Sequence, residues 1–77
     1  MTDVLFPAMS QENPSATGVL ATWFAREGEQ VAAGQVVAEV QMDKVDAEVV
    51  APTSGTLHVQ VEEGVEVTQG SVIATIS

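Results

Sequence analysis

The sequence predicts an all-β domain in which two small antiparallel sheets face each other as a flattened barrel-sandwich with pseudo-two-fold symmetry. The first observation is an internal repeat: residues 28–40 align with residues 64–76 at five identical positions of thirteen. The second is the alternation of Leu57, Val59 and Val61 with polar neighbours, which is typical of a strand with one buried face. No segment shows convincing helical periodicity, so we expect about eight short strands.

The chain opens with a predicted short strand, Asp3 to Phe6, that Pro7 ends. Residues 8–17 are polar and contain an Asn-Pro-Ser sequence, which is typical of an exposed loop. We therefore expect a loop between the first strand and a second strand that begins near Gly18.

The upstream strands of the two halves match only if the first half contains one extra residue between Leu20 and Trp23. We predict a β-bulge at this point. Trp23 is then expected to be a core residue rather than a surface for stacking a substrate. His58 falls on the outward face of its strand, and because no second His or Cys accompanies it, we predict no metal or catalytic role for it.

A hairpin is predicted around the only lysine of the chain. Residues 36–40 and 47–50 are rich in β-branched side chains, and the polar residues between them must reverse the chain. Asp43 and Asp46 suit turn positions because an aspartate can bond its own backbone. Lys44 should therefore lie at or beside the hairpin tip, where its side chain is displayed to a partner.

The predicted core combines the inward positions of all these strands. It consists of Val4, Phe6, Leu20, Trp23, Val31, Val36, Ala38, Val40, Val49, Leu57, Val59, Val61, Val67, Val72, Ala74 and Ile76.

Length and charge restrict the function further. Seventy-seven residues predict a single domain, residues 1–77, that is too small for a large catalytic cleft. A formal net charge of −9 argues against binding to nucleic acid or to an anionic membrane surface, and predicts partners with basic patches. The chain contains no cysteine and no apolar run long enough to cross a bilayer, which predicts a soluble, cytoplasmic protein.

The residues around the lysine resemble a known family. Asp43-Lys44-Val45, with Glu48 four residues after the lysine and Ala-Pro-Thr-Ser-Gly at 51–55, resembles the lipoyl domain of the dihydrolipoyl acyltransferase component of 2-oxo acid dehydrogenase complexes. The resemblance covers nearly the whole chain, with Gly18-Val19-Leu20, Trp23, Glu27-Gly28-Glu29 and Val31 matching the upstream half. Two residues depart from the family pattern: Gln41 stands where Glu is usual, and Met42 stands where Thr or Ser is usual.

The resemblance implies the fold of the biotinyl/lipoyl carriers, called the hybrid motif, and lipoic acid attached covalently to Lys44. It implies recognition roles for Asp43, Val45 and Glu48, and a loop at residues 8–17 that lies near the hairpin and helps the cognate dehydrogenase to recognise the domain. The implied partners are a thiamine-diphosphate-dependent 2-oxo acid dehydrogenase, a dihydrolipoyl dehydrogenase, an acyltransferase core, and a lipoate ligase or lipoyl transferase. The domain itself would be a monomeric carrier and not an enzyme.

Three other functions remain open at this point. Biotinyl domains share this architecture, so the chain could be a biotin carboxyl carrier domain, although Asp43 differs from the methionine expected before a biotinylated lysine. The acidic residues Asp43, Asp46 and Glu48 could form a metal or acid/base site, but their spacing lacks the order of a calcium loop. A structural module with no cofactor is the third.

Pseudo-symmetry also predicts that the lysine tip and the two termini lie at opposite ends, as a tethered carrier requires.

Overall fold

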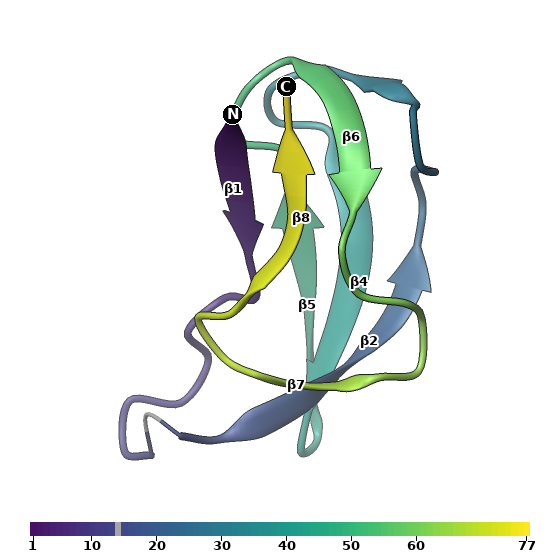
Figure 1. Cartoon of the computed structure of the whole chain (residues 1–77). Coiled ribbons are helices and arrows are strands. Elements are labelled where there is room, and N and C mark those ends of the chain that lie inside the picture. Colours follow the sequence, from purple (N-terminus) through teal and green to yellow (C-terminus); the bar gives the residue numbers. More distant parts are fainter. Residues whose placement is uncertain (14) are drawn as a thin grey trace.

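A computed structural model describes residues 1–13 and 15–77, and these residues form strands and loops but no helix. Figure 1 shows the chain folded as two layers of strands. The eight strands are β1 (Thr2–Leu5), β2 (Thr17–Trp23), β3 (Gln30–Val31), β4 (Val36–Met42), β5 (Val45–Val50), β6 (Gly55–Val59), β7 (Glu66–Thr68) and β8 (Val72–Ile76). The predicted number and type of elements are therefore confirmed for the described residues, in which no helix is long and apolar enough to span a membrane.

The strands form two four-stranded antiparallel sheets, with the orders β1-β8-β6-β3 and β5-β4-β2-β7. Each sheet takes strands from both halves of the sequence, so the halves are interleaved rather than placed side by side. The principal dimensions of 34 × 19 × 18 Å describe an elongated body. The predicted barrel-sandwich fold is confirmed.

Matched backbone hydrogen bonds confirm the predicted pseudo-symmetry. The Gly28 amide donates to the Leu57 carbonyl at 2.8 Å, and the Gly64 amide donates to the Leu20 carbonyl at the same distance. Gly28 and Gly64 also have nearly the same positive φ, 82° and 84°, a conformation that a side chain would disfavour. The repeated glycines thus form equivalent turns in the two halves.

The bulge predicted in the first half is also confirmed. Leu20 pairs with Val40 and Thr22 pairs with Glu39, so β2 contains one residue more than β4 between these two pairs. That residue is Ala21, and it restores the register that brings Trp23 opposite Ala38.

Part of the predicted core is wrong because of two further bulges, which lie at equivalent places in the two halves. The register between β4 and β5 shifts between Val36 and Ala38, and the register between β1 and β8 shifts between Val4 and Leu5. Because each shift leaves an extra residue in β4 or β8, two successive side chains point inward there. Val37 and Ile73 are consequently fully buried, whereas the predicted Val36 is half-buried and Val72 is exposed.

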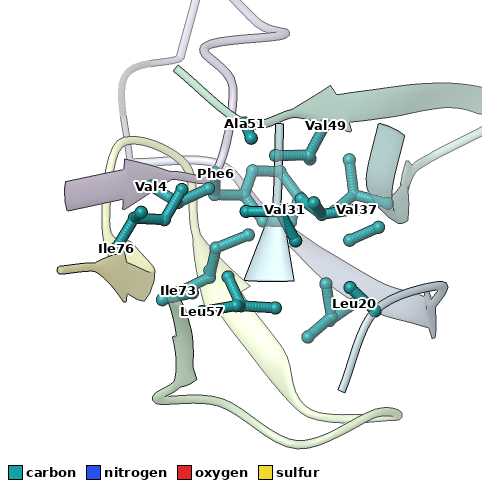
Figure 2. Packing of buried hydrophobic residues seen from close by; sticks show 14 of the residues in the cluster. Val4, Phe6, Leu20, Val31, Val37, Val49, Ala51, Leu57, Ile73 and Ile76 are labelled. Carbon is teal, nitrogen blue, oxygen red and sulfur yellow. The ribbon is translucent and has the colours of Figure 1, made fainter. Parts of the chain in front are cut away.

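Trp23, Val59 and Val61 were also predicted to be buried, but they are half-buried and pack against the edge of the core. The indole Nε1 of Trp23 donates to the Val61 carbonyl at 2.9 Å, so the ring lies at the border where its polar atom finds a partner. Figure 2 shows side chains from both sheets pointing toward one another in the centre. Residues buried there that the prediction missed are Ala25, Val37, Met42, Ala51 and Ile73.

The two ends of the body carry different parts of the chain. Figure 1 shows both termini at one end and the β4–β5 hairpin at the other. The predicted separation of the lysine tip from the termini is therefore confirmed.

Candidate functional site: the lysine hairpin

The β4–β5 hairpin reverses the chain with two residues. Met42 pairs with Val45, so Asp43 and Lys44 form the whole turn. Asp43 has a φ of 54° and is the only described residue other than glycine with a positive φ. A two-residue hairpin needs such a residue, and aspartate tolerates this conformation better than most side chains. The local sequence therefore determines where the strand turns and puts the lysine at the tip.

Lys44 is exposed, and among the described residues no carboxylate forms an ion pair with its amine. Asp43 and Asp46, which are its close neighbours in sequence, are exposed as well. A short two-residue turn between paired strands holds the Lys44 backbone, while its side chain reaches into solvent. The amine is thus available for acylation, and no packed side chain has to move to expose it.

The residues predicted to be read with the lysine lie around it in different ways. Asp43 shares the turn, and Val45 is the first residue of β5 with an exposed fraction of 59%. Glu48 lies farther along β5, opposite Glu39, so it is separated from the tip by several residues of strand. Asp46 and Glu48 are both exposed and fall on one face of β5, as strand alternation predicts.

Met42, directly before the turn, is buried, with an exposed fraction of 5%. It joins the core from the last position of β4, so the base of the hairpin is anchored although its tip is free. In the sequence, Met42 stands out only as a departure from the family pattern. Its position in the inward series Ala38, Val40 and Met42 was a signal that could have identified this anchor.

A shallow hollow of about 270 Å³ lies beside the hairpin. One wall comes from Met42, Asp43 and Val45, and the other comes from the loop after β1. The loop residues that line it are Met9, Ser10, Gln11 and Glu12. The structure therefore brings the loop next to the lysine hairpin, as the resemblance implied.

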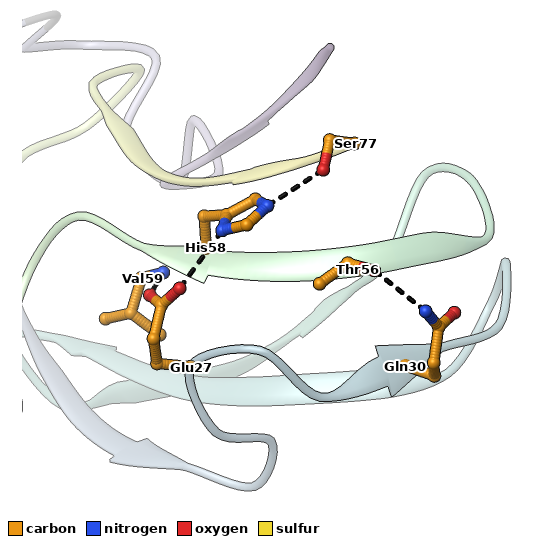
Figure 3. Close-up of polar contacts among 6 residues, drawn as sticks. All are labelled: Glu27, Gln30, Thr56, His58, Val59 and Ser77. Carbon is orange, nitrogen blue, oxygen red and sulfur yellow. Dashed lines mark hydrogen bonds and ion pairs between the residues drawn. The ribbon is translucent and has the colours of Figure 1, made fainter.

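A second polar cluster lies on the other sheet, toward the chain termini. Figure 3 shows the His58 ring between the Ser77 hydroxyl, 2.8 Å from Nε2, and the Glu27 carboxylate, 3.0 Å from Nδ1. The Val59 amide, which also donates to Glu27, and the His58 ring together hold the pKa of the Glu27 carboxyl below its usual value of 4.5. The sequence pattern does not predict these two contacts of His58, because Glu27 and Ser77 come from distant parts of the sequence.

This cluster is open to solvent, with exposed fractions of 37% for the His58 side chain and 60% for that of Glu27. In the described part of the chain, no group of three or more His, Cys, Asp or Glu side chains is arranged to hold a metal ion. The cluster joins the β2–β3 connection to β6 and to the chain end, and the lysine hairpin lies at the other end of the body.

Comparisons with known proteins identify the family of the chain. A family model named Biotin_lipoyl and described as "Biotin-requiring enzyme" matches residues 2–76. The dihydrolipoyllysine-residue acetyltransferase component of the pyruvate dehydrogenase complex of Staphylococcus aureus strain N315 is 42% identical over 60 residues, which cover 77% of this chain and 14% of that protein. The corresponding component of the acetoin cleaving system of Bacillus subtilis strain 168 is 37% identical over 60 residues, or 77% of this chain and 15% of that protein. The chain therefore spans about a seventh of the length of these curated relatives.

The fold gives the same result. The solution structure of the lipoyl domain of the 2-oxoglutarate dehydrogenase complex from Azotobacter vinelandii superimposes with a TM-score of 0.79 and 27% sequence identity. The match covers 100% of this chain and 96% of that domain. These relatives are named for lipoyl groups and not for biotin. By its sequence, its two interleaved sheets and its lysine hairpin, the chain belongs to the biotin/lipoyl carrier family and is a lipoyl-type domain.

Proposed function

We propose that the chain is a carrier domain in which Lys44 bears lipoic acid through an amide bond, and that it moves acyl groups and reducing equivalents between the components of a 2-oxo acid dehydrogenase complex. The observation that carries this proposal is the position of Lys44, the only lysine of the chain. It occupies an exposed two-residue turn at the end opposite the termini.

The residues of the hairpin fit such a group. A lysine side chain is a long, flexible stem whose amine can be acylated, and the strands below it are anchored by Met42. Acylation removes the positive charge of Lys44 and takes the formal net charge from −9 to about −10. No charged partner within the described residues loses an ion pair in this step.

The chain's own contribution is presentation. When attached, a lipoyl group supplies a dithiolane that accepts an acyl group together with two electrons. The protein supplies a rigid support for the arm. With the lipoyl group at the lysine end and a tether to the rest of the complex at the end of the termini, the arm would stay at high effective concentration near successive partners. Asp43, Val45 and Glu48 are proposed to be read by the enzyme that attaches the group.

The proposed partners follow from the relatives named above, which are acyltransferase components. They are a thiamine-diphosphate-dependent 2-oxo acid dehydrogenase, an acyltransferase core, a dihydrolipoyl dehydrogenase, and a lipoate ligase or lipoyl transferase. The negative charge of the domain favours partners whose binding surfaces are basic.

Reductive acylation in vitro tests the proposal. The chain is incubated with lipoate, ATP and a lipoate ligase, and the product is then offered to 2-oxo acid dehydrogenases with their radiolabelled substrates. We expect label to be incorporated into the wild type and none into Lys44→Arg, which keeps the charge but cannot be modified. Labelling of Lys44→Arg, or failure of the ligase to modify the wild type, would contradict the proposal.

Biotin is the alternative that the family description keeps open. Incubation with biotin, ATP and a biotin ligase provides the comparison. We expect no biotin on the chain, because Asp43 stands before the lysine. A biotin adduct at Lys44, formed in preference to a lipoyl adduct, would assign the domain to biotin transfer instead.

A further inference from the structure

The two halves of the domain differ most in one connection. The halves align Phe6-Pro7 with Ala51-Pro52 through matched hydrogen bonds: the Gly70 amide donates to the Phe6 carbonyl, and the Gly34 amide donates to the Ala51 carbonyl, both at 2.8 Å. Ten residues then join Pro7 to Gly18 in the first half, whereas two join Pro52 to Gly55 in the second. The scaffold needs only the shorter connection, so the longer one is an addition to it.

The added loop lies at the lysine end, where it forms a wall of the hollow beside the hairpin. A partner that reaches a group on Lys44 from this side of the hairpin meets the hollow and the loop. Apart from the hairpin, residues 9–12 are the only described residues that line the hollow. The shape of the loop therefore contributes to the surface that such a partner meets.

One side chain holds this loop. The side-chain oxygen of Gln69 accepts a hydrogen bond from the backbone amide of Ser10 at 2.9 Å. Its side-chain nitrogen donates to the Ser10 carbonyl at 2.7 Å and to the Asn13 carbonyl at 3.0 Å. The Gln69 backbone amide also donates to the Ala16 carbonyl at 3.0 Å. Gln69 thus pairs with both backbone groups of Ser10, as a residue of a neighbouring strand would. Through Ser10 and Ala16 it joins the start and the end of the loop to the turn before β8.

The equivalent position in the other half shows that the scaffold does not require a glutamine. Gly34 and Gly70 are equivalent, so Ala33 corresponds to Gln69. Ala33 precedes the same kind of turn with a methyl side chain, and its backbone amide donates to the Ser54 hydroxyl at 3.0 Å. Of these two equivalent positions, only the one beside the long loop carries a glutamine.

From this asymmetry we propose that Gln69 is a positioning residue: it orders the loop of residues 8–13 beside Lys44 and so sets how well a dehydrogenase recognises the lipoylated domain. The inference rests on the proposed function. The hydrogen bonds of Gln69 go to the loop and not to Lys44, so it acts by removing conformational freedom from the surface that the partner binds.

The test compares lipoylated Gln69→Ala and Gln69→Met with the wild type, using a 2-oxo acid dehydrogenase that acylates the wild type. Methionine keeps the length and apolar bulk of the side chain but makes none of the three hydrogen bonds, so it separates the bonds from the packing. Gln60→Ala is the matched control, because Gln60 is exposed and lines a different hollow with Glu27, His58 and Thr75.

We expect mass spectrometry to show complete lipoylation of all four proteins. For both Gln69 variants kcat/KM for reductive acylation should fall roughly tenfold through a higher KM, a loss of the size expected when a binding surface has to be ordered on association. Amide exchange should speed up at Ser10 and stay unchanged in β4 and β5. Gln60→Ala should match the wild type.

An unchanged kcat/KM in the two Gln69 variants, with faster exchange at Ser10, would overturn the role of Gln69 and leave the proposed function intact. Slow, wild-type exchange at Ser10 would also overturn it, because the loop would then not depend on Gln69. Failure of the wild type to be lipoylated or acylated is a separate result, and it overturns the proposed function together with this inference.

Discussion

The two ends of this domain are built by equivalent strands of the two halves, yet they carry different features. At the lysine end β4 turns directly into β5, and Lys44 occupies the turn. At the other end β8, the counterpart of β4, runs out at Ile76 beside the first residues of β1. The lysine end also carries the long loop and Gln69, whereas the terminal end has a connection of two residues and Ala33. We therefore expect the features that the halves share to stabilise the fold, and we propose that the features they do not share serve recognition.

If the halves share the stabilising scaffold, equivalent core residues should contribute alike. Leu20 and Leu57 are equivalent and fully buried. Leu20→Ala and Leu57→Ala should each lower the free energy of unfolding by about 2 to 5 kcal/mol, the range for a leucine removed from a packed core. Chemical denaturation measures both. Values that differ by more than half of the larger one would break the comparison.

The next effect is expected at two equivalent glycines that lie against the backbone of the opposite strand. A Cβ on Gly18 would meet the Phe6 ring and lie 2.6 Å from the Gln41 carbonyl oxygen, and one on Gly55 would lie 2.5 Å from the Ser77 carbonyl oxygen. Gly18→Ala and Gly55→Ala should therefore each cost about 1 to 3 kcal/mol of stability through overpacking. Thermal unfolding provides the measurement, and a neutral substitution at either site would show that the close approach there is not required.

A smaller effect should distinguish the lysine turn from the terminal end. Asp43 has a positive φ that a β-branched residue strongly disfavours, so Asp43→Val should cost about 1 to 2 kcal/mol, while Asp43→Gly should cost less. Denaturation of the unmodified proteins separates these outcomes from any effect on the attachment of a cofactor. Equal stability of the valine and glycine variants would mean that the turn relaxes to another conformation.

The smallest effect concerns the terminal end, where Glu27 joins His58 and the Val59 amide. These bonds lower the pKa of Glu27, so its stabilising contribution is present above its usual value of 4.5 and is lost as the pH falls through the lower pKa of the folded state. Glu27→Gln should thus be less stable than the wild type at neutral pH, and the difference should shrink below pH 4.5. A difference that grows on acidification would contradict this assignment.

The sequence predicted the features that depend on local pattern or on repetition. The bulge at Ala21 followed from one extra residue in the first half of the repeat, and the turn at Lys44 followed from polar residues between two β-branched runs. The bulges near Val37 and Ile73 were missed because both halves contain them, so the repeat showed no mismatch there. A shift of one residue moves side chains to the other face of a strand, which explains why Val36 and Val72 were wrongly placed in the core.

Contacts between distant side chains could not be predicted in this way. Gln69 and Ser10 are 59 positions apart, and no periodicity relates them. The same holds for His58 and Glu27, which lie 31 positions apart on different elements. Such pairs depend on the exact register of strands from both halves, which only the folded arrangement reveals.

The most direct test of the account is the mass of the protein purified from its own host, followed by peptide mapping. The account predicts one lipoyl group for each chain, attached to the peptide that contains Lys44. An unmodified Lys44 in cells that have lipoate and its ligase, or a biotin group in its place, would contradict it.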